Sequence, residues 1–452
     1  MKRILKLLLA ISVCLSLTAC DDVFLSVEKL MRPPNLSGED SILQAAFEAS
    51  VSENENVVMK TPFSGEYRSS YVLFDIDNDN KEEAIVLYSV PSDGDLVNAK
   101  IFDYSDDKWI NTSQISGNYS EIQEINFADI NGDGCHEICL SWISALEGNE
   151  DISSNLNLSY KLDIYSYENN RTSLVATESY TNFFVKDFNN DNADEILIFK
   201  INFSDIKNLT TVRLLSFEKD YSISYDEVTN ISPMPEICNI VNDKIVENGR
   251  EITRVFVDGT FNEIETYTEI IEIDNNFNIS LPLANDNITQ IPKTLRIGKY
   301  YCMDVDGDGN IEIPTLDTFP YSQGIYEDKK GPLNLVVWSE YANDNFNVKF
   351  KALLNSKIGQ LAIIPEDFIG NITAIYDDEN LNLTFYSVTP DGEIENALFS
   401  FRTFTIPDWE ENSYNYEIHS QNDTYVHSYL IFKADNYKTY KNFIMENFYA
   451  LK

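Results

Sequence analysis

The chain of 452 residues is strongly acidic, with 74 aspartates and glutamates against 33 lysines and arginines and a formal net charge of −41. Such a charge repels nucleic acids and anionic lipid headgroups, so neither is an expected partner. Hydrophobic residues make up 43% and aromatic residues 12% of the chain, which is enough to bury a core and argues against a disordered acidic polypeptide. The length predicts more than one domain.

The first twenty residues have the pattern of an export signal. Basic residues precede an apolar run from Leu7 to Leu17, which suits the core of a signal peptide and is too short to span a bilayer. The run ends in Leu-Thr-Ala-Cys, which resembles the lipobox of bacterial lipoproteins. The resemblance implies removal of residues 1–19 and a lipid anchor on Cys20, which would hold the protein on the outer side of the cytoplasmic membrane. A secreted protein with a chance cysteine at the cleavage site is the alternative.

Residues 20–59 are expected to form a tether and a short helix. The first part contains the sequence Arg-Pro-Pro-Asn, which favours an extended chain. Ser37 suits the N-cap of a helix on which Leu43, Phe47 and Val51 share one face. The helix is expected either to pack on the following domain or to remain a solvated part of the tether.

Four acidic stretches follow, and each leads into a run of apolar residues. Counted from its first aspartate, each stretch has Asp or Asn at position three, Asp at position five, Gly or Asn at position six, and Glu at position nine. Calcium binds six to eight oxygens, and a positive φ at position six, which Gly and Asn tolerate, turns the chain around the ion. The predicted ligands, with position seven contributing its backbone carbonyl, are Asp75, Asp77, Asp79, Lys81 and Glu83; Asp129, Asn131, Asp133, Cys135 and Glu137; Asp187, Asn189, Asp191, Ala193 and Glu195; and Asp304, Asp306, Asp308, Asn310 and Glu312. One such stretch would be an ordinary surface turn, but four in the same register predict up to four calcium ions.

These stretches do not fit the EF-hand pattern. An EF-hand has a bidentate Glu at position twelve and a helix on each side, whereas position twelve is apolar or threonine in this chain. The segments around the first stretch, 71–74 and 84–88, are rich in β-branched and aromatic residues and predict strands. The loops are therefore expected to connect strands.

The spacing of the stretches predicts a repeat architecture. Their first aspartates are 54, 58 and 117 residues apart, and the last interval is two periods of about 58. The missing repeat should centre near residue 245, where the sequence VNDKIVENG lacks the ligands. Five repeats of short strands over residues 60–350 predict a mainly β fold, a β-propeller of about five blades. A propeller of seven blades that takes up the rest of the chain is the alternative.

The pattern Asp-x-Asp-x-Asp-Gly-x-x-Glu resembles the calcium loops of FG-GAP and VCBS repeats, which occur in integrin α-chain propellers and exported bacterial proteins. The resemblance covers about two thirds of the chain and implies an extracellular β-propeller in which calcium stabilises the blades and takes no part in catalysis. The Phe-Gly and Gly-Ala-Pro signatures of that family are absent, so the number of blades is not implied. The loop at Asp304 is expected to bind calcium most tightly, because it combines three aspartates with Gly309 at position six.

The regular period ends near residue 350, and residues 351–452 are expected to form a small α+β domain. Several strand-like segments precede a final stretch with helical spacing of its apolar residues. These residues, a face that is more often buried than exposed, are Tyr437, Tyr440, Ile444, Phe448 and Leu451.

Four cysteines follow Cys20, namely Cys135, Cys139, Cys238 and Cys302. If the chain is extended there, Cys135 and Cys139 lie about 13 Å apart and cannot form a disulfide with each other. Zinc binding by Cys135, His136 and Cys139 is an alternative to ordinary packing, and other disulfide pairings remain open.

Catalytic motifs are few. The chain has three histidines and no nucleophile elbow, phosphate loop or metalloprotease helix. The expected function is that of a surface-anchored, calcium-stabilised module that binds a glycan or a protein. An extracellular enzyme of the polysaccharide lyase type and a scaffold of an exported assembly are the alternatives.

Overall fold

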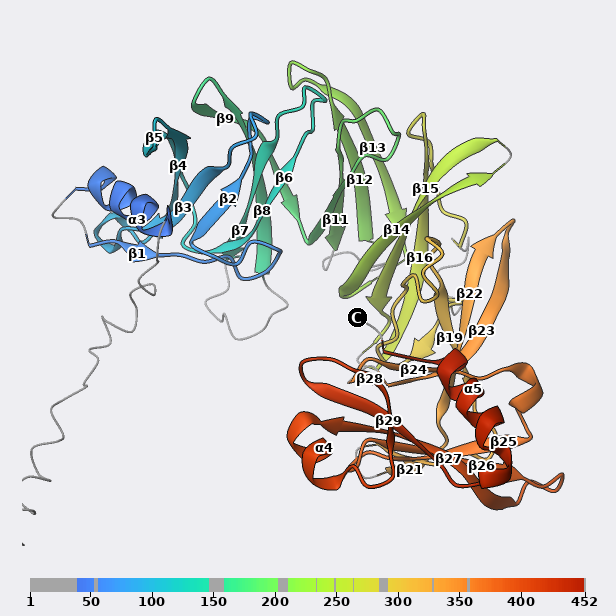
Figure 1. Ribbon diagram of the computed structural model, residues 1–452. Helices are drawn as coiled ribbons and strands as arrows, with labels where there is room; N and C mark the ends of the chain where they lie inside the picture. The colour runs from blue at the N-terminus through green and yellow to red at the C-terminus, as the bar shows by residue number, and fades with distance from the viewer. Residues whose placement is uncertain are drawn as a thin grey trace, which may run out of the picture. The chain divides into compact units, whose positions relative to one another are not determined.

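The computed structural model describes residues 39–52, 56–145, 158–201, 210–232, 234–247, 249–262, 264–283, 292–326, 329–355 and 358–450 (Figure 1). The predicted signal peptide, Cys20 and Ser37 therefore lie outside the described residues. The described part contains six antiparallel sheets of four or five strands and one two-stranded ribbon, so the prediction of a mainly β chain is confirmed. None of its helices has the length and hydrophobicity of a membrane span.

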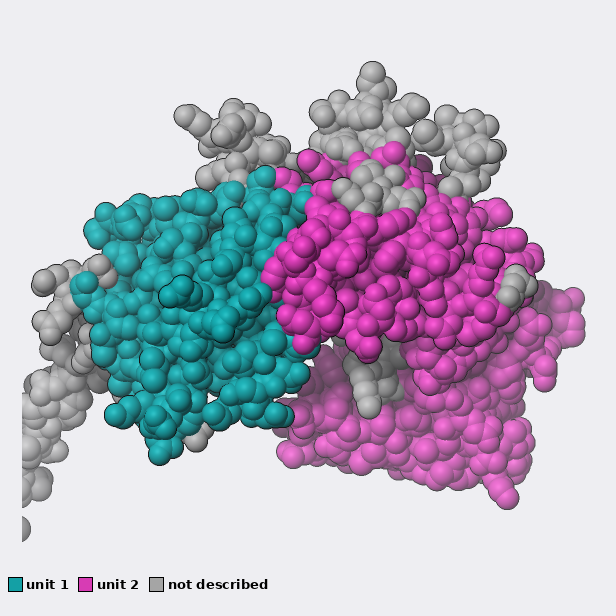
Figure 2. Space-filling model, turned by 90° about the horizontal axis from the view of Figure 1, so that it is seen from above, with its two compact units in different colours: residues 1–128, 134–178 teal, residues 129–133, 179–452 magenta. Residues whose placement is uncertain are grey.

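The chain divides into two compact units, which are described separately (Figure 2). Unit 1 consists of residues 1–128 and 134–178, and unit 2 of residues 129–133 and 179–452.

Unit 1 contains the first helix and two sheets. The elements of the first sheet are β1 (Val58–Met59), β2 (Tyr71–Phe74), β3 (Glu83–Ser89), β4 (Val97–Ser105) and β5 (Lys108–Ser116), with the short helix η1 (Pro91–Asp93) between β3 and β4. The second sheet runs in the order β6 (Ile122–Ala128), β7 (Glu137–Ala145), β8 (Leu158–Glu168) and β9 (Arg171–Tyr180). Ile85 and Leu87 of β3 share a buried cluster with Leu140 and Trp142 of β7, because alternate residues of each strand point to the same face.

The helix α3 (Glu39–Ser50) covers the other face of the first sheet. Leu43 and Phe47 are each 3% exposed and pack with Val86 and Tyr88 of β3. The rings of Phe47 and Tyr88 meet edge to face at 5.2 Å. Of the two expectations for this helix, packing on the following domain is therefore confirmed.

Unit 2 continues with three further sheets of the repeat region. The third sheet consists of β10 (Asn182–Lys186), β11 (Glu195–Ile201), β12 (Thr210–Phe217) and β13 (Ile223–Ile231). The fourth consists of β14 (Ile237–Glu247), β15 (Arg250–Thr260), β16 (Glu265–Asp274), β17 (Ile279–Ser280) and β18 (Arg296–Ile297). The fifth consists of β19 (Ile313–Thr318), β22 (Asn334–Ala342), β23 (Asn345–Asn355), β24 (Gln360–Ile363) and β30 (Phe448–Ala450), and the ribbon β20 (Gly324–Tyr326) and β21 (Lys329–Gly331) is inserted between β19 and β22.

The sheets follow the sequence repeat. Each period of about 58 residues corresponds to one antiparallel meander. Consecutive strands pair in β2–β5, β6–β9, β10–β13 and β14–β17, whereas in the fifth sheet the inserted ribbon separates β19 from its partner β22. A sheet also occupies the position of the repeat without an acidic stretch, where the hairpin β14–β15 spans residue 245.

The sixth sheet consists of β25 (Ile372–Asp377), β26 (Asn382–Val388), β27 (Ile394–Thr405), β28 (Glu417–Gln421) and β29 (Tyr425–Ile431). Its region also contains the helices α4 (Ile406–Asn412), α5 (Tyr437–Asn447), η3 (Glu366–Phe368) and η4 (Ala434–Asn436). Of the predicted apolar helix face, Ile444 of α5 is buried and Tyr437 is 37% exposed. The helix ends at Asn447, so Phe448, which is also buried, begins β30 and does not belong to the helix as predicted, and Leu451 lies outside the described residues.

The expected boundary between residues 350 and 351 falls inside β23. Strand β30 pairs with β24, so residues 448–450 complete the fifth sheet. Leu335 of β22 and Phe399 of β27 belong to the same buried cluster. The fifth and sixth sheets thus share one core.

Candidate metal centres

The acidic stretches are loops between strands. The first three connect β2 to β3, β6 to β7 and β10 to β11, and the fourth lies between Met303 and Glu312, which form an isolated bridge just before β19. These connections confirm the prediction that strands, not helices, flank the loops. The second loop is divided between the units, with residues 129–133 in unit 2 and the residues after them in unit 1.

Each loop turns twice through the left-handed region of the backbone. At position six, φ is 68° for Asn80, 91° for Gly134, 70° for Asn192 and 91° for Gly309. At position four, φ is 59° for Asn78, 67° for Gly132, 63° for Asn190 and 78° for Gly307. The turn at position six was predicted, and the turn at position four was missed. The signal was present, because both positions carry only Asn or Gly, the residues that best tolerate positive φ.

The aspartate at position one holds the loop in shape. In the first loop, the carboxylate of Asp75 accepts hydrogen bonds from the backbone N–H of Asp79 at 3.1 Å and of Asn80 at 3.0 Å. The same pattern recurs at Asp187, which accepts from Asn192, and at Asp304, which accepts from Gly309. The loops are therefore preorganised by the residues that were predicted to bind the ion.

The glutamate at position nine is buried in all four loops. Glu83, Glu137, Glu195 and Glu312 are each at most 1% exposed. Glu137 begins β7, and the other three lie at the start of β3, at the start of β11 and directly before β19. The Oε2 atom of each of these three accepts a hydrogen bond from the N–H of position two, at 2.8 Å from Ile76, 3.0 Å from Phe188 and 2.8 Å from Val305. This bond ties the end of the loop to its beginning.

Two of the buried glutamates have a second carboxylate oxygen that could bind a cation. Among the described residues, Oε1 of Glu195 and Oε1 of Glu312 are buried and have no hydrogen-bond partner. Burial raises the pKa of Glu83 to about 7, of Glu195 to about 8 and of Glu312 to about 7, and the nearby aspartates add to the increase. A buried carboxylate without a partner is unfavourable, so these groups fit the binding of a metal ion.

Carboxylate oxygens converge in two of the loops. Ligand atoms of Asp75, Asp77 and Glu83 lie within 4.8 Å of one another, and so do those of Asp304, Asp306 and Asp308. In the second and third loops an asparagine stands at position three, and its amide donates to the aspartate at position five, as from Asn189 Nδ2 to Asp191 Oδ2 at 2.8 Å. The position-seven residue is fixed by its own N–H, which donates to position five in the loops of Lys81, Ala193 and Asn310.

A lysine already supplies a positive charge at the fourth loop. Lys349 of β23 places its Nζ atom 2.7 Å from Asp308 and 3.4 Å from Asp306. It also lies 2.7 Å from Glu340 of β22, which forms a second acidic group with Asp308 and Glu312. The contacts of Lys349 and Glu340 with this loop could not be predicted from the sequence, because strand pairing brings these residues to a loop that precedes them by about 30 to 40 residues. The lysine places a positive charge at this loop and would compete with a metal ion there.

The loops also link one repeat to the next. The N–H of position eight donates to the preceding repeat, from His136 to Ile76 O at 2.8 Å and from Asp194 to Asp129 O at 2.7 Å. In the fourth loop, the N–H of Ile311 donates to Asp243 Oδ2 at 2.9 Å. An ion that orders one of these loops would therefore also order its contact with a neighbouring sheet of the same unit.

The fourth repeat has an arginine in place of the buried glutamate. Val255 of β15 pairs with Ile271 of β16, which lies three residues before the turn that begins at Asp274. In the third repeat, Ile196 of β11 pairs with Leu215 of β12, which lies three residues before the turn that begins at Glu218. Arg254 thus corresponds to Glu195. Its side chain is 2% exposed and forms an ion pair with Asp243, in which Nε donates to Oδ1 at 2.7 Å.

The described cysteines and histidines do not form a zinc site. Cys139 is buried in β7, Cys135 lies 3.5 Å from the carbonyl oxygen of Asp77, and none of the four described cysteines forms a disulfide. The ring of His136 packs edge to face on Phe74. The groups of metal-binding side chains found among the described residues contain only aspartate and glutamate.

No family model matches this sequence, and no curated protein matches it.

Proposed function

We propose that this chain is a calcium-stabilised repeat protein of the bacterial envelope, anchored through lipid on Cys20, that binds a glycan or a protein. The observation that carries the calcium part is the buried glutamate at position nine, which in Glu195 and Glu312 has an oxygen without a partner among the described residues. A calcium ion at each loop would pair that oxygen and draw further oxygens from positions one, three, five and seven.

The arrangement of the sheets supports a propeller-type fold as part of this proposal. Each repeat is one antiparallel meander, and the loop of one repeat donates a hydrogen bond to the repeat before it. On this proposal each sheet is a blade, and calcium stabilises each blade and its contact with the preceding one.

The test of the calcium site is a comparison of thermal unfolding in calcium, in magnesium and in chelator. Calcium at about 2 mM should raise the melting temperature, since an ion that binds only the folded chain stabilises it by mass action. Magnesium should have a smaller effect, because it demands six short oxygen contacts in octahedral geometry. The proposal is wrong if calcium at this concentration causes no stabilisation.

The test of the lipid anchor is the variant Cys20→Ser. The variant should accumulate as an unprocessed precursor or leave the membrane fraction, because it lacks the sulfur that carries the lipid. A variant of mature size that partitions with membranes as the natural protein does would contradict the anchor and leave the calcium sites unaffected.

A further inference from the structure

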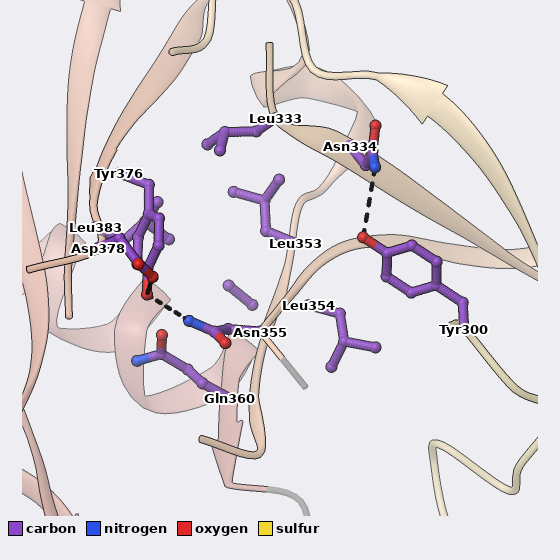
Figure 3. Close-up of a pocket in the computed structure, with 11 residues that line it drawn as sticks. Tyr300, Leu333, Asn334, Leu353, Leu354, Asn355, Gln360, Tyr376, Asp378 and Leu383 are labelled. Carbon is purple, nitrogen blue, oxygen red and sulfur yellow. Dashed lines mark hydrogen bonds between the residues drawn. The ribbon is translucent and has the colours of Figure 1, made fainter. Parts of the chain in front are cut away.

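A pocket of about 220 Å³ opens in unit 2, where residues of β22 to β24 meet residues of β25 and β26 (Figure 3). Six of the 11 lining side chains carry a polar oxygen or nitrogen, and the other five are leucine or alanine. A concave site with a few polar groups around an apolar lining is the usual form of a small-molecule site.

The polar side chains gather at two ends of the pocket. At one end, Asn355 Nδ2 donates to the hydroxyl of Tyr376 at 2.6 Å, and that hydroxyl lies 3.5 Å from Asp378 Oδ1. Figure 3 shows the amide of Gln360 beside them. At the other end, Asn334 Nδ2 lies 3.5 Å from the hydroxyl of Tyr300.

Several of these polar groups are held in place by burial. Gln360 is 4% and Tyr376 is 7% exposed, and Gln360 Nε2 lies 3.5 Å from Thr403 Oγ1. Leu333 and Leu353, 4% and 7% exposed, lie between the two polar ends in Figure 3. The pocket therefore presents fixed hydrogen-bonding groups on both sides of an apolar surface.

The chemistry of the lining selects a class of ligand. Among the described residues that line the pocket there is no lysine, arginine or histidine, whereas Asp378 is exposed there, so an anion is disfavoured. Amide and phenol groups both donate and accept hydrogen bonds, as the hydroxyl groups of a ligand do. The leucines suit the C–H face of a saturated ring. The volume is below the roughly 300–1,000 Å³ of sites for drug-sized ligands, so it fits one ring and not a chain of rings.

We infer that this pocket binds a single neutral, polyhydroxylated ring, one sugar unit of a glycan. The inference rests on the proposed function, in which the ligand is a glycan or a protein, and it favours a glycan as the ligand. A sugar ring has about twelve non-hydrogen atoms, so an affinity in the millimolar range is expected.

The test uses the full chain in detergent with calcium and a panel of probes observed by NMR. The probes are glucose, galactose, mannose, N-acetylglucosamine and inositol, with choline as a cationic probe and inorganic phosphate as an anionic one. At least one sugar or inositol should show saturation transfer and a saturable titration. Binding of choline or phosphate alone, or of no probe at 10 mM, would overturn the inference.

Two variants locate the binding. Tyr376→Phe removes a hydroxyl from the polar end, and Asp378→Asn keeps the shape of an exposed side chain while removing its charge. Each should weaken the binding about tenfold, as expected for the loss of a hydrogen bond to a bound ligand. The exposed Asp391→Asn, a matched change outside the pocket, should leave it unaltered. Equal binding by Asp378→Asn and the natural protein would show that the sugar binds elsewhere.

The calcium response of the same samples separates this inference from the proposed function. A protein that is stabilised by calcium and binds none of the sugars contradicts only the pocket. A protein that binds a sugar through Tyr376 and Asp378 and does not respond to calcium contradicts only the calcium sites.

Discussion

The third and fourth repeats have an acidic and a basic side chain at equivalent positions of β11 and β15. Glu195 begins β11 and keeps one buried oxygen without a partner in the described part of the chain, whereas Arg254 of β15 is buried in an ion pair with Asp243. A buried charge is costly unless it is paired. If the proposed function is correct, the cation of the third repeat is a calcium ion from solution, and the cation of the fourth repeat is the side chain of Arg254. A repeat without an acidic loop can therefore keep the same meander.

The fifth repeat lies between these two cases. Lys349 contacts Asp306, Asp308 and Glu340, but its side chain is 29% exposed and is therefore displaced more easily than Arg254. Hydrogen bonds to Asp308 and Glu340 raise the pKa of Lys349, so it stays charged beside the loop. The chain thus contains a buried side-chain cation, a partly exposed one, and loops that would take up a metal ion.

The variant Arg254→Met should cause the largest loss of stability. It leaves Asp243 buried and without its cation, and removing one partner of a buried ion pair costs about 3–5 kcal/mol. Calcium should not restore the loss, because this repeat has no acidic loop of its own to bind the ion and Asp243 touches the loop at Asp304 only through the N–H of Ile311. Urea unfolding, followed by circular dichroism, measures the loss of stability in calcium and in chelator.

The exposed Arg250→Met on the same strand is the matched control and should have little effect. A loss after Arg254→Met that calcium reverses would contradict the view that the fourth repeat is independent of the metal.

The variant Glu195→Gln should have opposite effects with and without calcium. In chelator, the neutral amide should leave the protein as stable as the natural one or more stable, because burial disfavours the charged form of Glu195 and raises its pKa to about 8. In about 2 mM calcium, the variant should lose about 1–2 kcal/mol of the stabilisation, the share of one site of submillimolar affinity. Thermal unfolding under both conditions measures the difference.

Glu218→Gln, a substitution of the same kind at an exposed residue in the turn between β12 and β13, is the control and should change the stability neither in calcium nor in chelator. If Glu195→Gln is equally destabilising in calcium and in chelator, Glu195 is a structural group and not a metal ligand.

The variant Lys349→Met should raise the affinity of the fourth loop for calcium. It removes a cation that competes for Asp306 and Asp308, and partly exposed ion pairs of this kind have modest strength, so a gain of about 3- to 10-fold is expected. Calorimetric titration should show one site that becomes tighter. Lys351→Met, two residues further along β23, removes a lysine that pairs with Asp317 and Glu366 and should leave the titration unchanged. Weaker calcium binding after Lys349→Met would show that the lysine assists the loop.

The local features of the loops could be predicted from the sequence, whereas the cations contributed by distant residues could not. The register of Asp75 to Glu83 and the turn at Asn80 follow from residue types a few positions apart, and the structure confirms the turn. The equivalence of Arg254 and Glu195 is visible only in the strand pairing, because the sequence around Arg254 lacks the pattern of the acidic loops. The boundary near residue 350 was placed where the period ends, but the pairing of β24 with β30 joins segments almost 90 residues apart and leaves no periodic signal.

The smallest effect is expected from an exposed ion pair in the sixth sheet, where the cation is again a side chain. Glu417 of β28 accepts hydrogen bonds from Tyr437, Lys441 and Tyr429, which lower its pKa to about 2. Because the folded-state pKa lies below the usual 4.5, this group adds stability above pH 4.5, and the contribution is lost as the pH falls from 4.5 to 2.

Glu417→Gln should therefore lower the melting temperature by about 1–2 °C at pH 7, a small change because Glu417 and Lys441 are 44% and 40% exposed and solvent screens the pair. The difference from the natural protein should shrink to zero as the pH approaches 2, which thermal unfolding at a series of pH values can follow, with the exposed Glu393→Gln as control. A difference as large as that of Arg254→Met would contradict the comparison, because it would mean that burial does not decide how much a side-chain cation contributes.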